Sequence, residues 1–172
     1  MIRILLTGLV LLGLQSVVFA QNESEIFAIY VVRHAEKESE ANDPEDPSLS
    51  SCGELRAQAL AKILSDIRLE KIYSTPYERT LSTARPITES RQLEIEIYDP
   101  SRLGEFSQLL LDARQDALVV GHSNTTGVLA GLLAGVSEEA FDEDIYDRLY
   151  QVAISGKQAR LNLLHQSFYC EP

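Results

Sequence analysis

The chain has 172 residues, of which 45% are apolar and 24% are charged. This balance excludes a disordered or collagen-like polymer, and the length favours a single domain. The formal net charge of -11 argues against nucleic acid as a partner and against docking on a bare anionic membrane, because like charges repel. Any anion-binding site would therefore depend on a few local cationic side chains.

The first twenty residues resemble a secretory signal peptide. Arg3 forms a short positive region, Ile4–Val18 is mostly apolar, and Ala20 ends the run as a small residue. The apolar run is shorter than the roughly 20 residues of a membrane-spanning helix. We therefore expect cleavage after Ala20 rather than an uncleaved anchor. Residues 21–172 would then be one exported domain without membrane insertion, and a Gram-negative periplasm is its expected location.

The first strand is expected in Ile26–Lys37, which reads I-F-A-I-Y-V-V-R-H-A-E-K. Seven apolar residues in an unbroken run favour a strand that is buried on both faces, as in a parallel sheet. Arg33 and His34 follow this run. They would lie at the carboxyl end of the strand, where open α/β sheets bind ligands. A guanidinium beside an imidazole at that place indicates a site for an anion.

The next part of the chain alternates helices with short strands. Acidic residues 38–51, with two prolines, predict a loop, and Ser50 or Ser51 is the expected N-cap of the following helix. That helix is expected over Gly53–Ser65, with an apolar face made of Leu55, Ala59, Leu60, Ile63 and Leu64. A strand Lys71–Ser74 should follow, and then a helix from about Tyr77 to Ser90 that is kinked at Pro86. An exposed edge strand Leu93–Tyr98 and a helix Arg102–Ala113 come next.

A second buried strand is expected at Ala117–Val120, followed by Gly121, His122 and Ser123. After it come a small-residue helix Thr125–Ala134, an acidic loop over residues 135–147, and a β-hairpin made of Leu149–Ile154 and Ala159–Leu164. Strands that alternate with helices predict an α/β fold. We expect a three-layer α/β/α sandwich with a mostly parallel central sheet.

Two of the three histidines directly follow the two buried strands. If these strands are parallel neighbours, the imidazoles of His34 and His122 converge at one edge of the sheet. A lone histidine at a strand end is more often structural, but the pair beside Arg33 favours a site. Arg79 lies early in a helix that starts at the same edge, where free backbone N–H groups attract anions. His165 lacks such a context and is expected to be structural or exposed.

Four short motifs in this order resemble the histidine phosphatase superfamily, the clan of phosphoglycerate mutases and acid phosphatases. They are R-H-A-E-K, L-S-x-x-G-x-x-x-A-x-x-L-A, Y-S-T-P-x-x-R-T-x-x-T-A and V-V-G-H-S-N-T. The resemblance extends from about Ile26 to Leu164 and implies a phosphoglycerate mutase-like fold. Many members have glycine where this chain has Ala35. That variant is similar to the short bacterial phosphohistidine phosphatases and their exported relatives.

This resemblance implies a metal-independent phosphatase that hydrolyses a phosphomonoester or phosphoramidate. His34 would be the nucleophile and form a phosphohistidine that water then hydrolyses. Arg33 and Arg79 would hold phosphoryl oxygens, because a guanidinium fork matches their geometry. His122 and the amide of Ser123 would add further donors. The expected partner is a small phosphorylated substrate, and no metal or other cofactor is expected.

The proton donor for the leaving group is the open part of the prediction. Many members carry a glutamate after the third strand, but this chain reads Y-D-P-S-R-L-G-E-F there. Asp99, Glu105 and Glu36 are candidates, although the position of each fits a helix cap or a solvated carboxylate better than an acid. Without an acid, substrates with good leaving groups, such as phosphoramidates, would be favoured.

Two other interpretations stay open, together with the state of the cysteines. The pocket could bind a phosphate or phosphosugar without turnover, or His34, His122 and loop carboxylates could hold a metal ion. Cys52 and Cys170 could form a disulfide in an exported protein or remain as two thiols. A metal site made from them is disfavoured because neither belongs to a C-x-x-C motif.

Overall fold

A computed structural model describes residues 25–41 and 43–170, so the expected signal peptide lies outside the described residues. Six strands form one sheet in the order β3-β2-β4-β1-β5-β6. β1 to β4 are mutually parallel, while β5 and β6 form an antiparallel hairpin at one side. Their bounds are β1 Ile26–Arg33, β2 Lys71–Ser74, β3 Ile95–Ile97, β4 Ala117–Gly121, β5 Arg148–Ser155 and β6 Gln158–His165.

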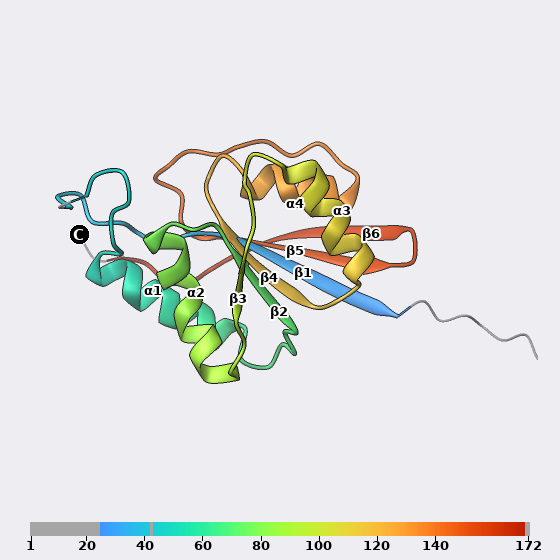
Figure 1. Cartoon of the computed structure of the whole chain (residues 1–172), viewed down its shortest axis with the longest axis horizontal. Helices are drawn as coiled ribbons and strands as arrows, with labels where there is room; N and C mark the ends of the chain where they lie inside the picture. Colours follow the sequence, from blue (N-terminus) through green and yellow to red (C-terminus); the bar gives the residue numbers. More distant parts are fainter. Residues whose placement is uncertain (1–24, 42, 171–172) are drawn as a thin grey trace, which may run out of the picture.

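Helices cover both faces of this sheet (Figure 1). They are α1 Ser51–Ile63, α2 Glu78–Arg91, α3 Leu103–Ala113 and α4 Thr126–Ala134. One buried cluster joins α3 and α4 to the sheet, through residues such as Leu110 and Leu129, and another joins α1 and α2 through Leu60 and Ile87. The predicted α/β sandwich with a sheet that is mostly parallel in its core is therefore confirmed.

The central position of β1 explains its continuous hydrophobicity. Ile29 and Val31 point into the cluster under α3 and α4, whereas Tyr30 and Val32 point into the cluster under α1 and α2. β1 has β4 on one side and β5 on the other. A strand buried on both faces has no solvent-facing positions to fill with polar residues, and this produces the unbroken apolar run.

The apolar face predicted for α1 is partly wrong. Leu55 and Ile63 have exposed fractions of 54% and 46%, whereas Arg56 and Ala57 are buried. Gly53 sets this orientation, because a Cβ there would lie 2.1 Å from the carbonyl oxygen of Glu36. Arg56 faces inward because it pairs with the Glu36 carboxylate. The helix is thus oriented by a close backbone contact and an ion pair in addition to the burial of Leu60, and this leaves Leu55 and Ile63 on the exposed side.

The remaining elements agree with the predictions within a few residues. Ser50 is the N-cap of α1, and its hydroxyl accepts a hydrogen bond from the amide of Gly53 at 3.1 Å. Pro86 lies inside α2, β3 is a short edge strand, and the hairpin is longer than expected. Among the described residues, no helix has the length and apolar character needed to cross a membrane.

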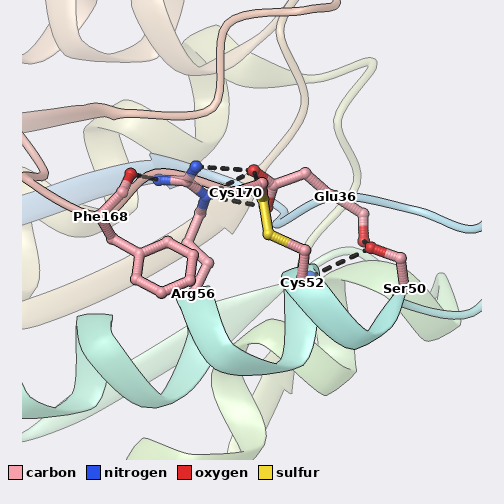
Figure 2. The surroundings of a disulfide bond; sticks show 7 residues. Glu36, Ser50, Cys52, Arg56, Phe168 and Cys170 are labelled. Carbon is pink, nitrogen blue, oxygen red and sulfur yellow. Dashed lines mark hydrogen bonds and ion pairs between the residues drawn. A yellow bond between two sulfur atoms is a disulfide. The ribbon is translucent and has the colours of Figure 1, made fainter. Parts of the chain in front are cut away.

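A disulfide joins the C-terminal segment to the start of α1 (Figure 2). Cys52 and Cys170 are 118 positions apart, with their Cα atoms separated by 5.7 Å. Arg56 lies beside them and donates to both carboxylate oxygens of Glu36 and to the carbonyl of Phe168 at 3.1 Å. The disulfide and Arg56 therefore tie together the tail, α1 and the segment that follows Arg33 and His34.

Candidate active site

A cavity of about 500 Å³ opens at the carboxyl ends of the parallel strands. It is lined by the five residues that were predicted to attack or bind the phosphoryl group, namely Arg33, His34, Arg79, His122 and Ser123. Lys37, Tyr77 and Glu143, to which the sequence analysis assigned no role, line it as well. The sheet edge predicted to bind a ligand thus carries the cavity in which the predicted residues meet.

The two histidines converge because β1 and β4 are parallel neighbours. Arg33 is in register with Gly121, and the backbone N–H of His34 donates to the Gly121 carbonyl at 2.9 Å. The ring centroids of His34 and His122 are 5.4 Å apart. Glycine is needed at position 121 because a Cβ there would lie 2.6 Å from the Tyr98 hydroxyl. The spatial prediction for the two imidazoles is confirmed.

His34 is held as a neutral imidazole in one tautomer. Its Nδ1 lies 2.8 Å from the carbonyl oxygen of Ala35, which can only accept, so Nδ1 carries the proton and Nε2 keeps its lone pair. Burial is the main cause that lowers the pKa of His34 to about 3, and the positive charges of Arg33 and Arg79 lower it further. The hydrogen bond to Ala35 opposes this shift. A neutral ring with a free Nε2 lone pair is the form that can act as a nucleophile.

His122 is also neutral in the absence of a ligand. Burial lowers its pKa to about 4, with further contributions from the charges of Arg79 and Arg33. Its Nε2 lies 3.0 Å from the Thr75 hydroxyl, and the Tyr77 ring meets it edge-on with a centroid separation of 5.3 Å. These contacts from the segment after β2 fix the plane of the ring.

Arg33 is buried, and part of its guanidinium binds the loop before β5. Its Nη1 donates to the carbonyl oxygens of Glu143 and, at 3.1 Å, of Ile145, and its guanidinium lies over the Tyr146 ring at 4.1 Å from the centroid. Its Nε is buried without a hydrogen-bond partner within the described part of the chain. A buried donor left unpaired costs about 1–3 kcal/mol. Arg33 therefore retains a donor that a ligand oxygen could satisfy.

Arg79 projects from the first turn of α2 and packs over the Tyr77 ring at 4.3 Å from its centroid. Its Nη1 donates to the Asp46 carboxylate at 3.2 Å. Asp46 also accepts from the amide of Glu78 at 2.9 and 3.0 Å, and so it caps α2 from the acidic loop. Sequence reasoning missed Asp46, because nothing local in a polar loop indicates which helix the loop will reach.

The three candidate acids are not brought to the cavity. Glu36 is paired with Arg56, Asp99 accepts from the amide and hydroxyl of Ser101, and Glu105 pairs with Arg102. Asp99 and Glu105 are exposed carboxylates, which was one of the stated alternatives, whereas Glu36 forms a largely buried ion pair that neither alternative described. His165, which was expected to be structural or exposed, is exposed and pairs with Asp147 at 2.8 Å.

Glu143 is the carboxylate that lines the cavity, and sequence reasoning missed it. Its side chain is 76% exposed and lies 3.8 Å from the Lys37 ammonium. The residue belongs to the loop of residues 135–147, in which several acidic residues follow one another. Composition could not distinguish it from its neighbours.

A metal site at the two histidines finds no support among the described residues. In the described part of the chain, the three potential ligands that lie close enough together to hold a metal ion are Glu36, Cys52 and Cys170, and the two cysteines form a disulfide with each other. Within residues 25–41 and 43–170, His34 and His122 have no third ligand near enough to complete such a group. The geometry is that of an anion site with two neutral imidazoles and two guanidiniums.

Comparison with known proteins gives matches in sequence and in fold. The family model for the histidine phosphatase superfamily (branch 1) matches residues 29–108. Phosphoserine phosphatase 1 of Hydrogenobacter thermophilus is 41% identical over 71 residues, which are 39% of this chain and 34% of that protein. The chain thus aligns with about a third of the length of this curated relative.

Several solved structures share the fold. The alpha-ribazole phosphatase of Shigella flexneri has a TM-score of 0.67 and 18% identity, and the match covers 85% of this chain and 100% of that one. The protein histidine phosphatase SixA complexed with tungstate has a TM-score of 0.68 and 15% identity, with 81% of this chain and 97% of that one covered. A mycobacterial glucosyl-3-phosphoglycerate phosphatase has a TM-score of 0.65 and 13% identity, with 83% of this chain and 100% of that one covered. At these identities they demonstrate the fold alone. The family-model match covers Arg33, His34 and Arg79, so residues 29–108 are similar in sequence to the histidine phosphatase superfamily.

Proposed function

We propose that the protein is a metal-independent phosphatase that forms a phosphohistidine on His34. The observation that carries this proposal is that His34 is neutral, with Nδ1 hydrogen-bonded to the carbonyl oxygen of Ala35, in a cavity lined by Arg33, Arg79 and His122. A phosphomonoester or phosphoramidate is the proposed substrate. The names of the relatives support this class, because phosphoserine and glucosyl-3-phosphoglycerate are phosphomonoesters and a protein histidine phosphatase acts on a phosphoramidate.

The reaction proceeds in two displacements at phosphorus. Nε2 of His34 forms a bond to phosphorus, and the bond from phosphorus to the leaving oxygen or nitrogen breaks, so its electron pair departs with the leaving group. Water then attacks phosphorus, the P–N bond to His34 breaks, and inorganic phosphate and the neutral imidazole are released. Splitting one difficult hydrolysis into two easier steps is the advantage of a covalent intermediate.

The charges around the cavity suit the transferring phosphoryl group. Arg79 and the remaining donors of Arg33 would bind its equatorial oxygens, and the amide of Ser123 at the end of β4 would add a backbone donor. A bound anion beside His122 favours the charged imidazolium, so this ring becomes a further cationic donor when substrate arrives. These cations take the part that Mg²⁺ has in other phosphoryl transfers.

Turnover of p-nitrophenyl phosphate tests the proposal against a pocket that only binds phosphate. We expect hydrolysis by the wild type, loss of hydrolysis in His34→Asn, and little change in the control His165→Asn, which alters an exposed histidine. Rapid quenching should trap an acid-labile, base-stable phosphate that maps to His34. Phosphate binding without any turnover would establish the binding module, and activity abolished by a chelator would establish the metal site.

We further propose that the protein acts outside the cytoplasm. The signal-like first twenty residues support export, and a disulfide between Cys52 and Cys170 suits an oxidising compartment. Fractionation of cells that produce the full chain tests this proposal. Recovery of a shortened, oxidised protein in the periplasmic fraction is expected, and a full-length, reduced protein in the cytoplasm would contradict it.

A further inference from the structure

The cavity holds a carboxylate to which the family motifs assign no role. Glu143 lines it together with His34 and His122, although it comes from the loop between α4 and β5 rather than from the segment after β3. The charge of Glu143 acts on both Arg33 and His122, where it opposes the fall in their pKa values. Its carboxylate is thus electrostatically coupled to two groups that line the phosphoryl site.

The backbone of Glu143 is anchored beside the nucleophile. Arg33, the residue before His34, donates to the carbonyl oxygens of Glu143 and Ile145 and packs over Tyr146. The Tyr146 ring in turn meets the His34 ring with a centroid separation of 6.2 Å. The loop is therefore fixed at the edge of β1, while the Glu143 side chain stays exposed and free to turn toward a substrate.

The ion pair of Glu143 with Lys37 does not prevent such a movement. The two groups are 3.8 Å apart and both side chains are well exposed, so the pair contributes little to stability. The Glu143 side chain can therefore leave Lys37 and turn toward a substrate bound in the cavity that it lines.

Resting on the proposed phosphatase function, we propose that Glu143 is the acid that protonates the leaving group. As the bond between phosphorus and the leaving oxygen breaks, the Glu143 carboxyl transfers its proton to that oxygen, and an alcohol and a carboxylate result. The three candidates drawn from the sequence are held elsewhere by Arg56, Ser101 and Arg102. Glu143 gives the site a means to act on alkyl phosphates, which are poor substrates without an acid.

Leaving-group dependence tests this role in Glu143→Gln, which keeps the size and removes the proton. Ethyl phosphate needs a proton on departure, whereas p-nitrophenolate leaves as a stable anion. We expect kcat/KM for ethyl phosphate to fall by about 100-fold or more, the usual effect of losing a general acid, and kcat/KM for p-nitrophenyl phosphate to stay within a few-fold of wild type. This ratio reports only the first transfer to His34, so a slow second step does not affect it.

The matched control is Asp144→Asn, which makes the same change of charge at the adjacent, exposed position of the loop. It should retain the turnover of both substrates. An equal loss with both substrates in Glu143→Gln, no loss with ethyl phosphate, or a loss with ethyl phosphate in Asp144→Asn as well would each overturn the proposal. Failure of the phosphatase function itself has another signature, because the wild type would then hydrolyse neither substrate.

Discussion

Removal of the disulfide should destabilise the protein without abolishing its chemistry. Cys52 and Cys170 close a loop across 118 positions, nearly the whole described domain. In the chain-entropy model, a loop of this length costs the unfolded state about 16 cal/mol/K, which is about 4.9 kcal/mol at 25 °C. Because measured values usually fall below this limit, we expect Cys52→Ser/Cys170→Ser to lose about 2–5 kcal/mol of unfolding free energy.

Urea unfolding followed by circular dichroism measures this loss. With a urea dependence of about 2 kcal/mol per molar, the midpoint should fall by about 1–2.5 M. Dithiothreitol should produce the same fall in the wild type and leave the double variant unchanged, which serves as the control. Replacing both cysteines avoids an unpaired thiol that could form intermolecular bonds.

Activity should survive because the contacts nearest to His34 do not need the disulfide. Glu36 keeps its ion pair with the buried Arg56, and Gly53 keeps its close contact with the Glu36 backbone. Below the unfolding transition, kcat/KM for p-nitrophenyl phosphate should therefore change by less than about threefold, a barrier change of well under 1 kcal/mol. A midpoint that does not move on reduction would refute the entropic reasoning. A large loss of activity in the folded variant would show instead that the tail positions the site.

Three further outcomes follow from the same contacts. The pKa of His34 is lowered to about 3, so between that value and its ordinary value near 6.5 the unfolded state binds more protons. This histidine should therefore make the free energy of unfolding fall with decreasing pH by up to about 1.4 kcal/mol per pH unit, and His34→Asn should remove that share of the slope in urea unfolding at pH 7 and pH 5, while His122 keeps its own share. The pKa of His122 is lowered to about 4 in the absence of a ligand and should rise beside an anion, so vanadate binding near pH 5.5 should be accompanied by uptake of a proton. Calorimetry in buffers of different ionisation enthalpy measures this uptake, and a binding enthalpy that is the same in all buffers would show that the ring stays neutral. Asp46→Ala removes the cap of α2 and should cost about 1 kcal/mol, whereas Asp46→Asn, which keeps an acceptor for the Glu78 amide, should cost less in thermal unfolding.

The sequence allowed the site to be predicted where chemistry and strand position coincide. The run before His34 and the run before His122 are apolar throughout, which marks both strands as central. Central parallel strands end at one edge, so the pattern predicts that the two imidazoles converge if the strands are neighbours, and the pairing of β1 with β4 meets that condition. Arg79 could be added because α2 begins at that same edge.

Contacts between distant segments could not be predicted in this way. Asp46 reaches the first amide of α2 from 32 positions earlier, and Glu143 meets Arg33 across 110 positions. Both lie in acidic loops in which several residues have the same charge and no periodic pattern distinguishes one from the next. The family pattern directed attention to Asp99 and Glu105, which the structure uses for a turn and a surface ion pair.

The amino-acid sequence by itself determined the order of strands and helices, the parallel core of the sheet, and the positions of His34, His122 and Arg79 at one edge. These follow from local hydrophobic patterns and from the rule that parallel strands share a direction. Only the tertiary structure decided which face of α1 is buried, that Cys52 meets Cys170, and which carboxylate enters the cavity. These depend on how loops and a tail pack against the finished sheet, and such packing is set by long-range contacts that no short stretch of sequence encodes.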